Sequence, residues 1–326
     1  MMPNTRQHVA VQQSAGILNY SNRGKVRVQG ADHVSFLHSM ISHDVEKLEE
    51  YRGRYGTFLT HNGKLICDFY FYKLREHILV DLNPGLSPRL VESLNRFVVM
   101  DDVELVDESG SWDHISVQGP MAATILEAVF SASPPAQHYR VQEVPSQQAL
   151  LINKAELAES GYDVLLPRGA GEPWISSVVE KFGSRGVLVV DEEVRNILRL
   201  ELGTPWFGVD MDESNYPMEA GLEESISLTK GCFVGQEVVA KATHIGGVRR
   251  RLGKLIFPPG STIPEKGAKV MKEGTPIGSV TSGAESIRLQ RPIALAYLIQ
   301  ARISTGDQVM VLVNGEAVPA CVVGSF

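Results

Sequence analysis

Apolar and polar residues alternate in several short runs near the start of the chain. Gly24 to Gly30 alternates with period two, which predicts a strand, and residues 31–40 repeat their apolar positions with helical spacing, which predicts a helix. Two more alternating runs, residues 55–60 and 64–72, flank Asn62-Gly63, a pair typical of the type I′ turn of a β-hairpin. A further strand is expected at 77–82 and a helix at 86–97.

A second block of mixed strands and helices begins near Trp112. Its periodicity predicts strands at 113–118, 148–152 and 162–166, and helices at 120–129, 172–182 and 191–202. Residues 1–16 are polar and are expected to be frayed, and the proline-containing stretch 131–145 is expected to be a loop.

Beyond Arg251 the pattern changes to short β runs that are interrupted by Gly and Pro, which is typical of a small barrel or sandwich. We therefore expect an α+β protein with three parts. These are a first block at 1–111, a second block at 112–250 and a C-terminal β domain at 251–326.

Composition and charge exclude several classes of protein. Apolar residues make up 43% of the 326 and charged residues 21%, which is ordinary for a globular protein and argues against disorder. The net charge of −7 disfavours nucleic-acid contact outside a local basic patch. No secretory signal and no run of ~18 apolar residues is present, so we expect a cytoplasmic protein without a membrane segment. The three cysteines form no C-x-x-C pair and are expected to be free thiols.

The segment from Lys230 to Glu237 has the strongest chemical signal. Gly231 and Gly235 frame Cys232, and the residues from Gln236 to Thr243 are expected to form a helix. A thiol just before a helix N-terminus and close to a lysine is placed to favour the reactive thiolate. A small buried cysteine in a turn explains the same spacing, and the spacing alone leaves both interpretations open.

This segment resembles the K-G-C-x-x-G-Q-E signature of the YgfZ-type folate-binding proteins, relatives of the glycine-cleavage T-protein. The matching positions are Lys230, Gly231, Cys232, Gly235, Gln236 and Glu237. The resemblance continues in residues 198–203, 207–210 and 217–222, which are similar to the T-protein pattern of arginine–leucine–glutamate, glycine and P-x-E-A-G-L, and in the Q-G-P of residues 118–120. Together the matches extend over roughly residues 24–252.

The resemblance implies a fold and a function. The fold would be a pair of T-protein-like folate-binding domains, including a ferredoxin-like element, with a C-terminal β-barrel. The protein would bind tetrahydrofolate or a one-carbon derivative, support the assembly or repair of iron–sulfur enzymes and tRNA modification, and have iron–sulfur proteins as partners. The alternatives are a folate-dependent aminomethyltransferase or related demethylase, and a non-catalytic scaffold that contacts iron–sulfur proteins.

Two acids carry the expected folate site. Glu201 shares one helical face with Val194 and Leu198, and a buried carboxylate there needs partners, either a ligand or an arginine such as Arg199 or Arg250. In the family, the glutamate at this position binds the pterin ring. Asp68 lies on a strand where T-protein has two successive aspartates, and Cys67 replaces the first of them.

Two further residues complete the expected site. Arg250, in the run Arg249 to Arg251, matches a family arginine that faces the folate, and Asp81 matches a polar position near the pterin. We expect folate in a cavity lined by Glu201, Asp68 and Arg250, with Cys232 and Asp68 as the chemical groups. No metal site is expected from the histidines, because no pair of carboxylates completes a ligand set.

Overall fold

The computed structural model describes residues 3–241 and 247–324, which divide into two compact units. Unit 1 contains the chain up to Phe58 together with residues 67–194 and 229–234. Unit 2 contains residues 59–66, 195–228 and the chain from Gly235 onwards.

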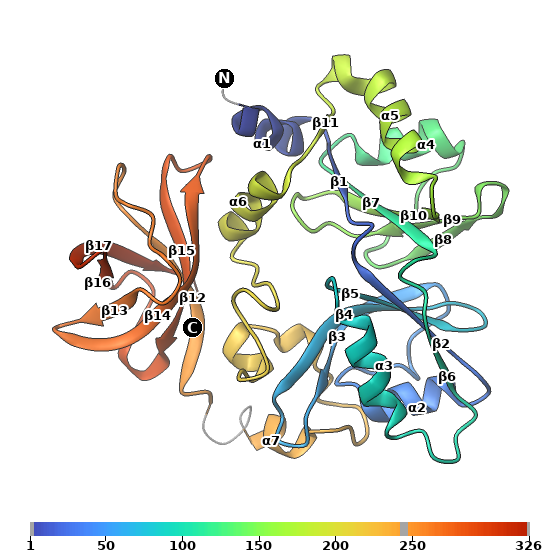
Figure 1. Ribbon diagram of the computed structural model, residues 1–326, viewed down its shortest axis with the longest axis horizontal. Helices are drawn as coiled ribbons and strands as arrows, with labels where there is room; N and C mark the ends of the chain where they lie inside the picture. Colours follow the sequence, from blue (N-terminus) through green and yellow to red (C-terminus); the bar gives the residue numbers. More distant parts are fainter. Residues whose placement is uncertain (1–2, 242–246, 325–326) are drawn as a thin grey trace. The chain divides into compact units, whose positions relative to one another are not determined.

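Unit 1 contains a five-stranded sheet in the order β3-β4-β5-β2-β6 (Figure 1). Asp81 of β5 stands opposite Lys25 of β2 on one side and opposite Tyr70 of β4 on the other. The register therefore gathers polar groups around Asp81 in the middle of the sheet. The strands are β2 (Gly24–Gln29), β3 (Arg52–Leu59), β4 (Leu65–Lys73), β5 (Ile78–Leu82) and β6 (Glu104–Asp107), and the helices between them are α2 (His33–Met40) and α3 (Ser87–Asn95).

The turn between β3 and β4 differs from the expected type I′ turn. That turn needs a positive φ at both Asn62 and Gly63, but of the two only Gly63 has one, at 71°. The amide of Gly63 donates to the carbonyl of Thr60, and the amide of Thr60 donates to the carbonyl of Lys64. The loop thus has three residues and ends in a left-handed glycine, the next most common hairpin connection. The type I′ prediction was wrong, whereas the hairpin itself is confirmed.

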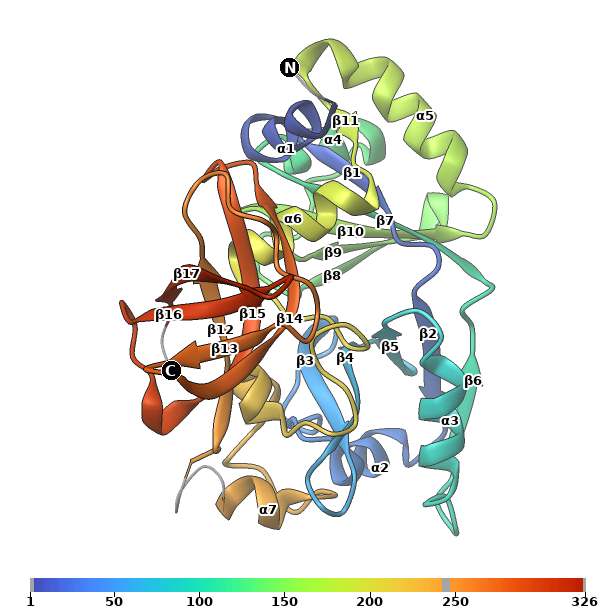
Figure 2. The same ribbon diagram turned by 60° about the vertical axis from the view of Figure 1, so that its left-hand side comes forward.

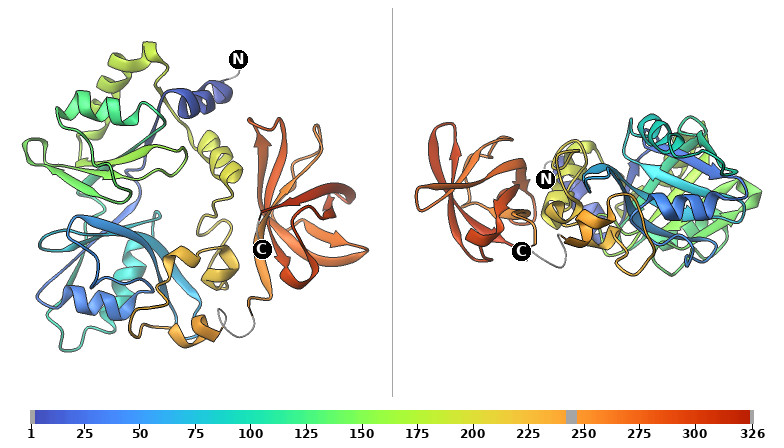
Figure 3. Two further views of the ribbon diagram at one scale, coloured as in Figure 1. Left: turned by 180° about the vertical axis from the view of Figure 1, so that it is seen from behind. Right: turned by 90° about the horizontal axis from the view of Figure 1, so that it is seen from below.

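Unit 1 also contains a six-stranded sheet in the order β11-β1-β7-β10-β9-β8. Helices α4 (Ala122–Phe130) and α5 (Gly171–Phe182) pack on one face of it, where Ile125 and Val178 join the apolar core (Figures 1 and 3). In β7 and β10, Ser116 stands opposite Asp163. The strands are β1 (Gly16–Asn19), β7 (Trp112–Gln118), β8 (Val141–Val144), β9 (Ala149–Asn153), β10 (Gly161–Pro167) and β11 (Leu188–Val189).

Two segments of unit 1 are more ordered than the sequence predicted. Residues 1–16 were expected to be frayed, but helix α1 (Pro3–Gln13) buries Ala10 and Val11, and its carbonyl groups lie close to Gly119. Few apolar residues suffice to dock a helix when those few are fully buried, so the polar composition was misleading. The expected loop 131–145 contains the short edge strand β8, which pairs with β9.

Unit 2 contains a closed barrel in the order β12-β15-β14-β13-β16-β17 (Figure 2). Its core is made of alternating inward residues such as Leu255, Val311 and Val322. The strands are β12 (Arg250–Ile256), β13 (Lys269–Lys272), β14 (Thr275–Ser286), β15 (Arg291–Ile299), β16 (Gln308–Val313) and β17 (Glu316–Val323). The predicted C-terminal β domain is confirmed as a barrel.

Two further helices contain parts of the sequence motifs. Helix α6 (Glu192–Leu202) matches the predicted span, and helix α7 (Gln236–Lys241) follows the cysteine segment. Residues 242–243 of the predicted helix, and Gly246 of the loop before the arginines, lie outside the described residues. Among the residues that the structure describes, no helix is both long and apolar enough to cross a membrane.

The predicted α+β class is confirmed, because two sheets with their associated helices precede the closed barrel. The expected boundaries at 111 and 250 stay predictions. Strand β1, from the first expected block, pairs with β7 and β11 of the second.

Candidate functional site

Asp68 and Cys67 lie next to each other on β4 in unit 1, and they differ in their surroundings. Cys67 is fully buried, and burial raises the pKa of its thiol far above the ordinary value. The Asp68 carboxylate accepts a hydrogen bond of 2.7 Å from the Tyr55 hydroxyl and one of 3.4 Å from the Asn83 side-chain amide. Burial raises the pKa of Asp68, while the donation from Tyr55 and the charge of Arg23 partly oppose this shift.

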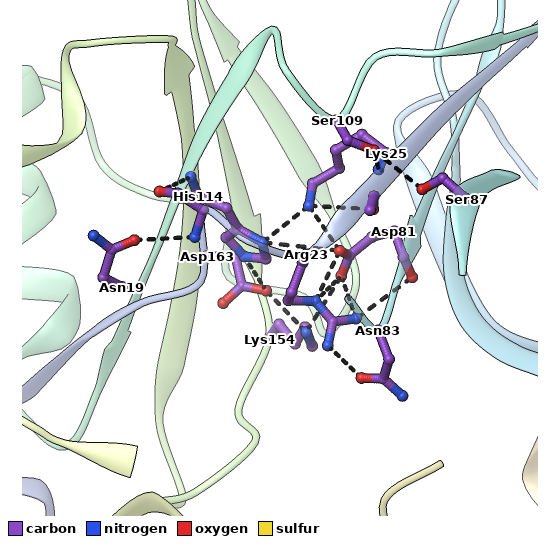
Figure 4. A network of polar contacts seen from close by, with 12 residues as sticks. Asn19, Arg23, Lys25, Asp81, Asn83, Ser87, Ser109, His114, Lys154 and Asp163 are labelled. Carbon is purple, nitrogen blue, oxygen red and sulfur yellow. Dashed lines mark hydrogen bonds and ion pairs between the residues drawn. The ribbon is translucent and has the colours of Figure 1, made fainter. Parts of the chain in front are cut away.

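Asp81 is surrounded by cations of its own sheet (Figure 4). The guanidinium of Arg23 binds both carboxylate oxygens, with Nε 2.9 Å from Oδ1 and Nη2 2.9 Å from Oδ2. The ammonium of Lys25 donates to Oδ1 at 2.9 Å. All three side chains are at most 5% exposed. The expected role of Asp81 beside the pterin stays a prediction, and its carboxylate is largely occupied by these two cations.

The same cluster includes three residues of the six-stranded sheet and its loops. Lys154 donates to Asp163 at 2.9 Å and lies 3.8 Å from Asp81. His114 has its Nε2 3.0 Å from Asp163 and its Nδ1 3.2 Å from the ammonium of Lys25. This buried cluster, which we call the ionic network (Arg23, Lys25, Asp81, His114, Lys154 and Asp163), therefore joins the two sheets of unit 1 (Figure 4).

The ionic network is strongly charged, and each of its side chains is at most 5% exposed. Burial alone would raise the pKa of Asp81, but the positive charges of Arg23, Lys25 and Lys154 hold it well below the usual range. Burial lowers the pKa of His114, so the imidazole is neutral at pH 7. Charges this deep are tolerated only when each is paired, because an unpaired buried ion costs several kcal/mol.

Glu201 lies near the end of α6 in unit 2 and is 5% exposed. Its Oε1 accepts from the Ser286 hydroxyl at 2.7 Å and from the Arg288 backbone amide at 3.0 Å. The sequence predicted that a buried carboxylate here needs partners, and these barrel residues supply two. The expectation that Glu201 binds a pterin stays a prediction.

Arg250 begins the first barrel strand in unit 2. Its Nε donates to Glu219 at 3.0 Å, and its guanidinium lies 4.9 Å from the centre of the Tyr297 ring. Hydrogen bonding by Glu219 raises the pKa of Arg250, so this side chain keeps its positive charge. Among the three successive arginines, Arg251 pairs with Glu223 at 2.5 Å.

The cysteine segment is held in place by Lys230. Its ammonium donates to the backbone carbonyls of His38, Ile41 and His43, at and just beyond the end of α2. An ammonium has only three donors, so these carbonyls use all of them. Cys232, two residues later, is exposed, which favours the accessible thiol over the buried cysteine that its spacing also allowed. Lys230 therefore anchors the backbone of this segment, which the sequence did not predict.

The second half of the signature belongs to unit 2. Gly235 has a φ of +83°, and a Cβ there would lie 2.6 Å from the carbonyl oxygen of Thr60, so only glycine fits. Glu237 is exposed and pairs with Lys241 at 2.7 Å, one turn later in α7. Gln236 is the first residue of that helix.

The structure thus links only some of the expected site residues. In unit 1, Asp68 and Asp81 are connected through Asn83 and Arg23, because Arg23 donates to Asn83 at 2.9 Å and Asn83 donates to Asp68. In unit 2, Glu201 and Arg250 each have separate partners. Sequence reasoning missed the residues of unit 1 that contact Asp68 or that form the ionic network with Asp81. They are Arg23, Lys25, Tyr55, Asn83, His114, Lys154 and Asp163.

Family comparisons cover nearly the whole chain. Residues 3–230 match the family described as the GCVT N-terminal domain, and residues 249–326 match the glycine cleavage T-protein C-terminal barrel domain. An aminomethyltransferase of Desulfitobacterium hafniense is 27% identical over 98% of this chain and 88% of its own length. An aminomethyltransferase of Nostoc sp. is 29% identical over 98% and 86% of the two chains.

A solved structure has the same fold. The glycine cleavage system aminomethyltransferase T of Bartonella henselae superposes with a TM-score of 0.88, covering 98% of this chain and 88% of the other. The two sequences are only 22% identical, so this likeness concerns the fold alone.

Proposed function

The chain belongs to the glycine-cleavage T-protein superfamily, and on that premise we propose that it binds tetrahydrofolate, with Asp68 as the acid that faces the ligand. The observation that carries this proposal is the buried carboxylate of Asp68, held by Tyr55 and Asn83 on the strand that resembles the aspartate strand of T-protein. When bound, tetrahydrofolate would supply the nitrogens that can carry a one-carbon unit.

The acceptor chemistry of Asp68 fits such a ligand. Among the side chains that the structure describes, Tyr55 is a short donor to Oδ2 and Asn83 a long donor to Oδ1, so the carboxylate can accept from a further N–H group. Pterin N–H groups are donors of this kind. Because burial raises the pKa of Asp68, the same group is suited to hold or release a proton close to a bound ligand. Glu201 and Arg250 are the further folate-binding residues of the proposal.

Within this family, the proposed role is to support the assembly or repair of iron–sulfur enzymes, including those that modify tRNA. Two observations favour it over simple aminomethyl transfer. Cys67 replaces one acid of the T-protein pair with a buried, uncharged thiol. Cys232 is exposed within the K-G-C-x-x-G-Q-E segment, where a reactive thiol can be reached by a client protein.

Aminomethyl transfer is the second candidate, and the names of the relatives favour it. It would use Asp68 as its only acid. Turnover of a methylamine donor that is lost in Asp68→Asn would support this candidate. Normal complementation by Cys232→Ala of a strain lacking the protein, measured as activity of its iron–sulfur enzymes, would contradict a reactive role for Cys232 and favour the non-catalytic scaffold that contacts iron–sulfur proteins.

Calorimetry with tetrahydrofolate tests the binding step itself through Glu201. Loss of a charged hydrogen-bond partner costs ~1.5–3 kcal/mol, so Glu201→Gln should weaken binding about tenfold or more. Glu193→Gln is the matched control, because Glu193 is an exposed acid of the same helix. If Glu201→Gln binds tetrahydrofolate as tightly as the control, Glu201 is not part of the site.

A further inference from the structure

Asp68 is connected to the ionic network by a single chain of side chains. We propose that Asn83 and Arg23 are positioning residues for Asp68, with Asp81 as the anchor that fixes the guanidinium. This inference rests on the proposed function, in which Asp68 faces the folate. It assigns an indirect role to Asp81, which acts through Arg23.

The guanidinium of Arg23 makes the connection because it contacts two groups at once. Nε and Nη2 bind the Asp81 carboxylate, and Nη1 donates to the Asn83 side-chain oxygen at 2.9 Å (Figure 4). A planar fork with fixed donors can hold both partners in a set geometry, whereas an ammonium acts as a single point charge. Arg23 is 5% exposed, so solvent does not compete strongly for these donors.

The contact with Arg23 decides which way the Asn83 amide faces. An asparagine side chain has one acceptor and one donor group, and the oxygen here is taken by the guanidinium. The NH₂ group must then point the other way, and it lies 3.4 Å from Oδ1 of Asp68. Without Arg23, rotation of the amide by half a turn would aim its oxygen at the carboxylate, where two acceptors repel each other.

Asp81 holds the guanidinium in turn. It is 2% exposed and also binds Lys25, so its position is fixed by the sheet and by the ionic network. The other groups that act on Asp68 are the hydroxyl of Tyr55 from β3 and the backbone amide of Asp68 itself, while the carboxylate in turn raises the pKa of the neighbouring Cys67 thiol. The Tyr55 hydroxyl donates to Oδ2 and the Asn83 amide donates to Oδ1.

The test is the titration of the Asp68 carboxyl carbon by ¹³C NMR in the full-length protein without folate, with the signal assigned from Asp68→Asn. Asn83→Ala removes the donor at Oδ1, so the titration midpoint should move to higher pH. Arg23→Lys keeps the positive charge but loses the fork, so the midpoint should move in the same direction. The double variant should shift no further than the larger single shift, because both changes break one chain.

Asn95→Ala is the matched control, because Asn95 is an exposed asparagine at the end of α3, and it should leave the midpoint unchanged. An unchanged midpoint in Asn83→Ala overturns the proposal. An unchanged midpoint in folded Arg23→Lys shows that only the charge of residue 23 matters, which also overturns it. If Arg23→Lys does not fold, Asn83→Ala decides alone.

Failure of the proposed function gives a different result. If the wild-type protein takes up no tetrahydrofolate in calorimetry, the folate proposal fails, while the NMR titration still reports whether Arg23 and Asn83 set the protonation of Asp68. If tetrahydrofolate binds and the midpoint does not respond to either change, only the positioning chain is wrong.

Discussion

Asp68 and Cys67 are neighbours in sequence, and the alternation of β4 separates them into two environments. That Cys67 belongs to the core could be predicted, because strand side chains alternate between faces. The partners of Asp68 could not, because Tyr55 and Asn83 lie 13 and 15 residues away and neither belongs to a recognisable motif. Their contact depends on strand register, which a single sequence does not specify in detail.

The three thiols should react in an order set by their exposure. Cys232 is exposed, Cys321 is intermediate and Cys67 is buried. In the native protein, iodoacetamide should therefore label Cys232 first. Cys67 should react slower by a factor of about 10³ or more, because it is reached only when the protein opens. Mass spectrometry of timed samples measures this order, with unfolded protein as the control in which Cys67 is accessible. Faster labelling of Cys67 than of Cys232 would contradict the structure.

Lys230 is the residue of the signature whose role was least visible in the sequence. Lys230→Met removes all donors to the three carbonyls near the end of α2, and burial leaves water a poor substitute. The free energy of unfolding should fall by ~1.5–3 kcal/mol, the usual range for a charged hydrogen-bond donor. Urea denaturation measures the change. Lys241→Met is the control, because the contact of this exposed lysine within residues 3–241 and 247–324 is an ion pair with Glu237 of α7, which contributes ~0.3–0.5 kcal/mol. Equal stability of the two variants would show that Lys230 is no anchor.

At the scale of elements, periodicity predicted most of the regular structure. Long apolar repeats gave α5 and α6 within one residue of their observed ends. The failures included α1 and β8, which have few apolar residues and depend on contacts with distant segments. Local patterns lose predictive value where tertiary packing supplies the stabilisation.

The docking of α1 provides a test through Gly119 of the Q-G-P motif. Its φ is +128°, and an added Cβ would lie 2.6 Å from the carbonyl oxygen of Val11 and 2.7 Å from that of Ser14. Gly119→Ala should therefore lower the free energy of unfolding by at least about 2 kcal/mol, since such backbone strain alone costs ~1–3 kcal/mol. Gly110→Ala, at an open position with nothing within 4 Å, should change it by less than about 0.5 kcal/mol. Thermal or urea denaturation of both variants compares them, and a Gly119→Ala protein as stable as the control would mean that α1 is not packed as described.

At the scale of the whole molecule, the class and the barrel could be predicted, but the ionic network could not. In β2, Lys25 and Arg27 occupy equivalent positions of the alternating pattern, although only Lys25 is fully buried. Whether a charged residue on the polar face of a strand is exposed depends on what covers that face. Here His114, Lys154 and Asp163 from the second sheet cover it.

The network also makes stability depend on pH. Burial lowers the pKa of His114, so between pH 7 and 5 the unfolded chain takes up a proton that the folded protein refuses, and stability falls as the pH falls. The folded protein also lowers the pKa values of Asp81 and Asp163. Below about pH 4, protonation of these two carboxylates therefore decreases the stability further. Burial raises the pKa of Asp68, so just above that pH the folded protein takes up a proton more readily than the unfolded chain. This group therefore increases the stability as the pH falls.

Urea denaturation at pH 7.5 and 5.5 measures the histidine contribution. The decrease in stability should be smaller in His114→Gln than in the wild type, but not absent, because burial also lowers the pKa values of His43 and His77. His61→Gln is the control at an exposed position and should keep the wild-type decrease. If His114→Gln retains the full decrease, the neutral buried imidazole is not its source.

The central claim is that this member of the T-protein superfamily binds tetrahydrofolate through Asp68. Its most direct test is a calorimetric titration of the full-length protein with tetrahydrofolate at pH 7.5, repeated with Asp68→Asn and with Asp101→Asn, a control at an exposed acid. We expect saturable binding to the wild type and the control, and binding weakened about tenfold or more in Asp68→Asn, since an amide replaces the charged acceptor. No binding to the wild type, or equal affinity in all three proteins, would contradict it.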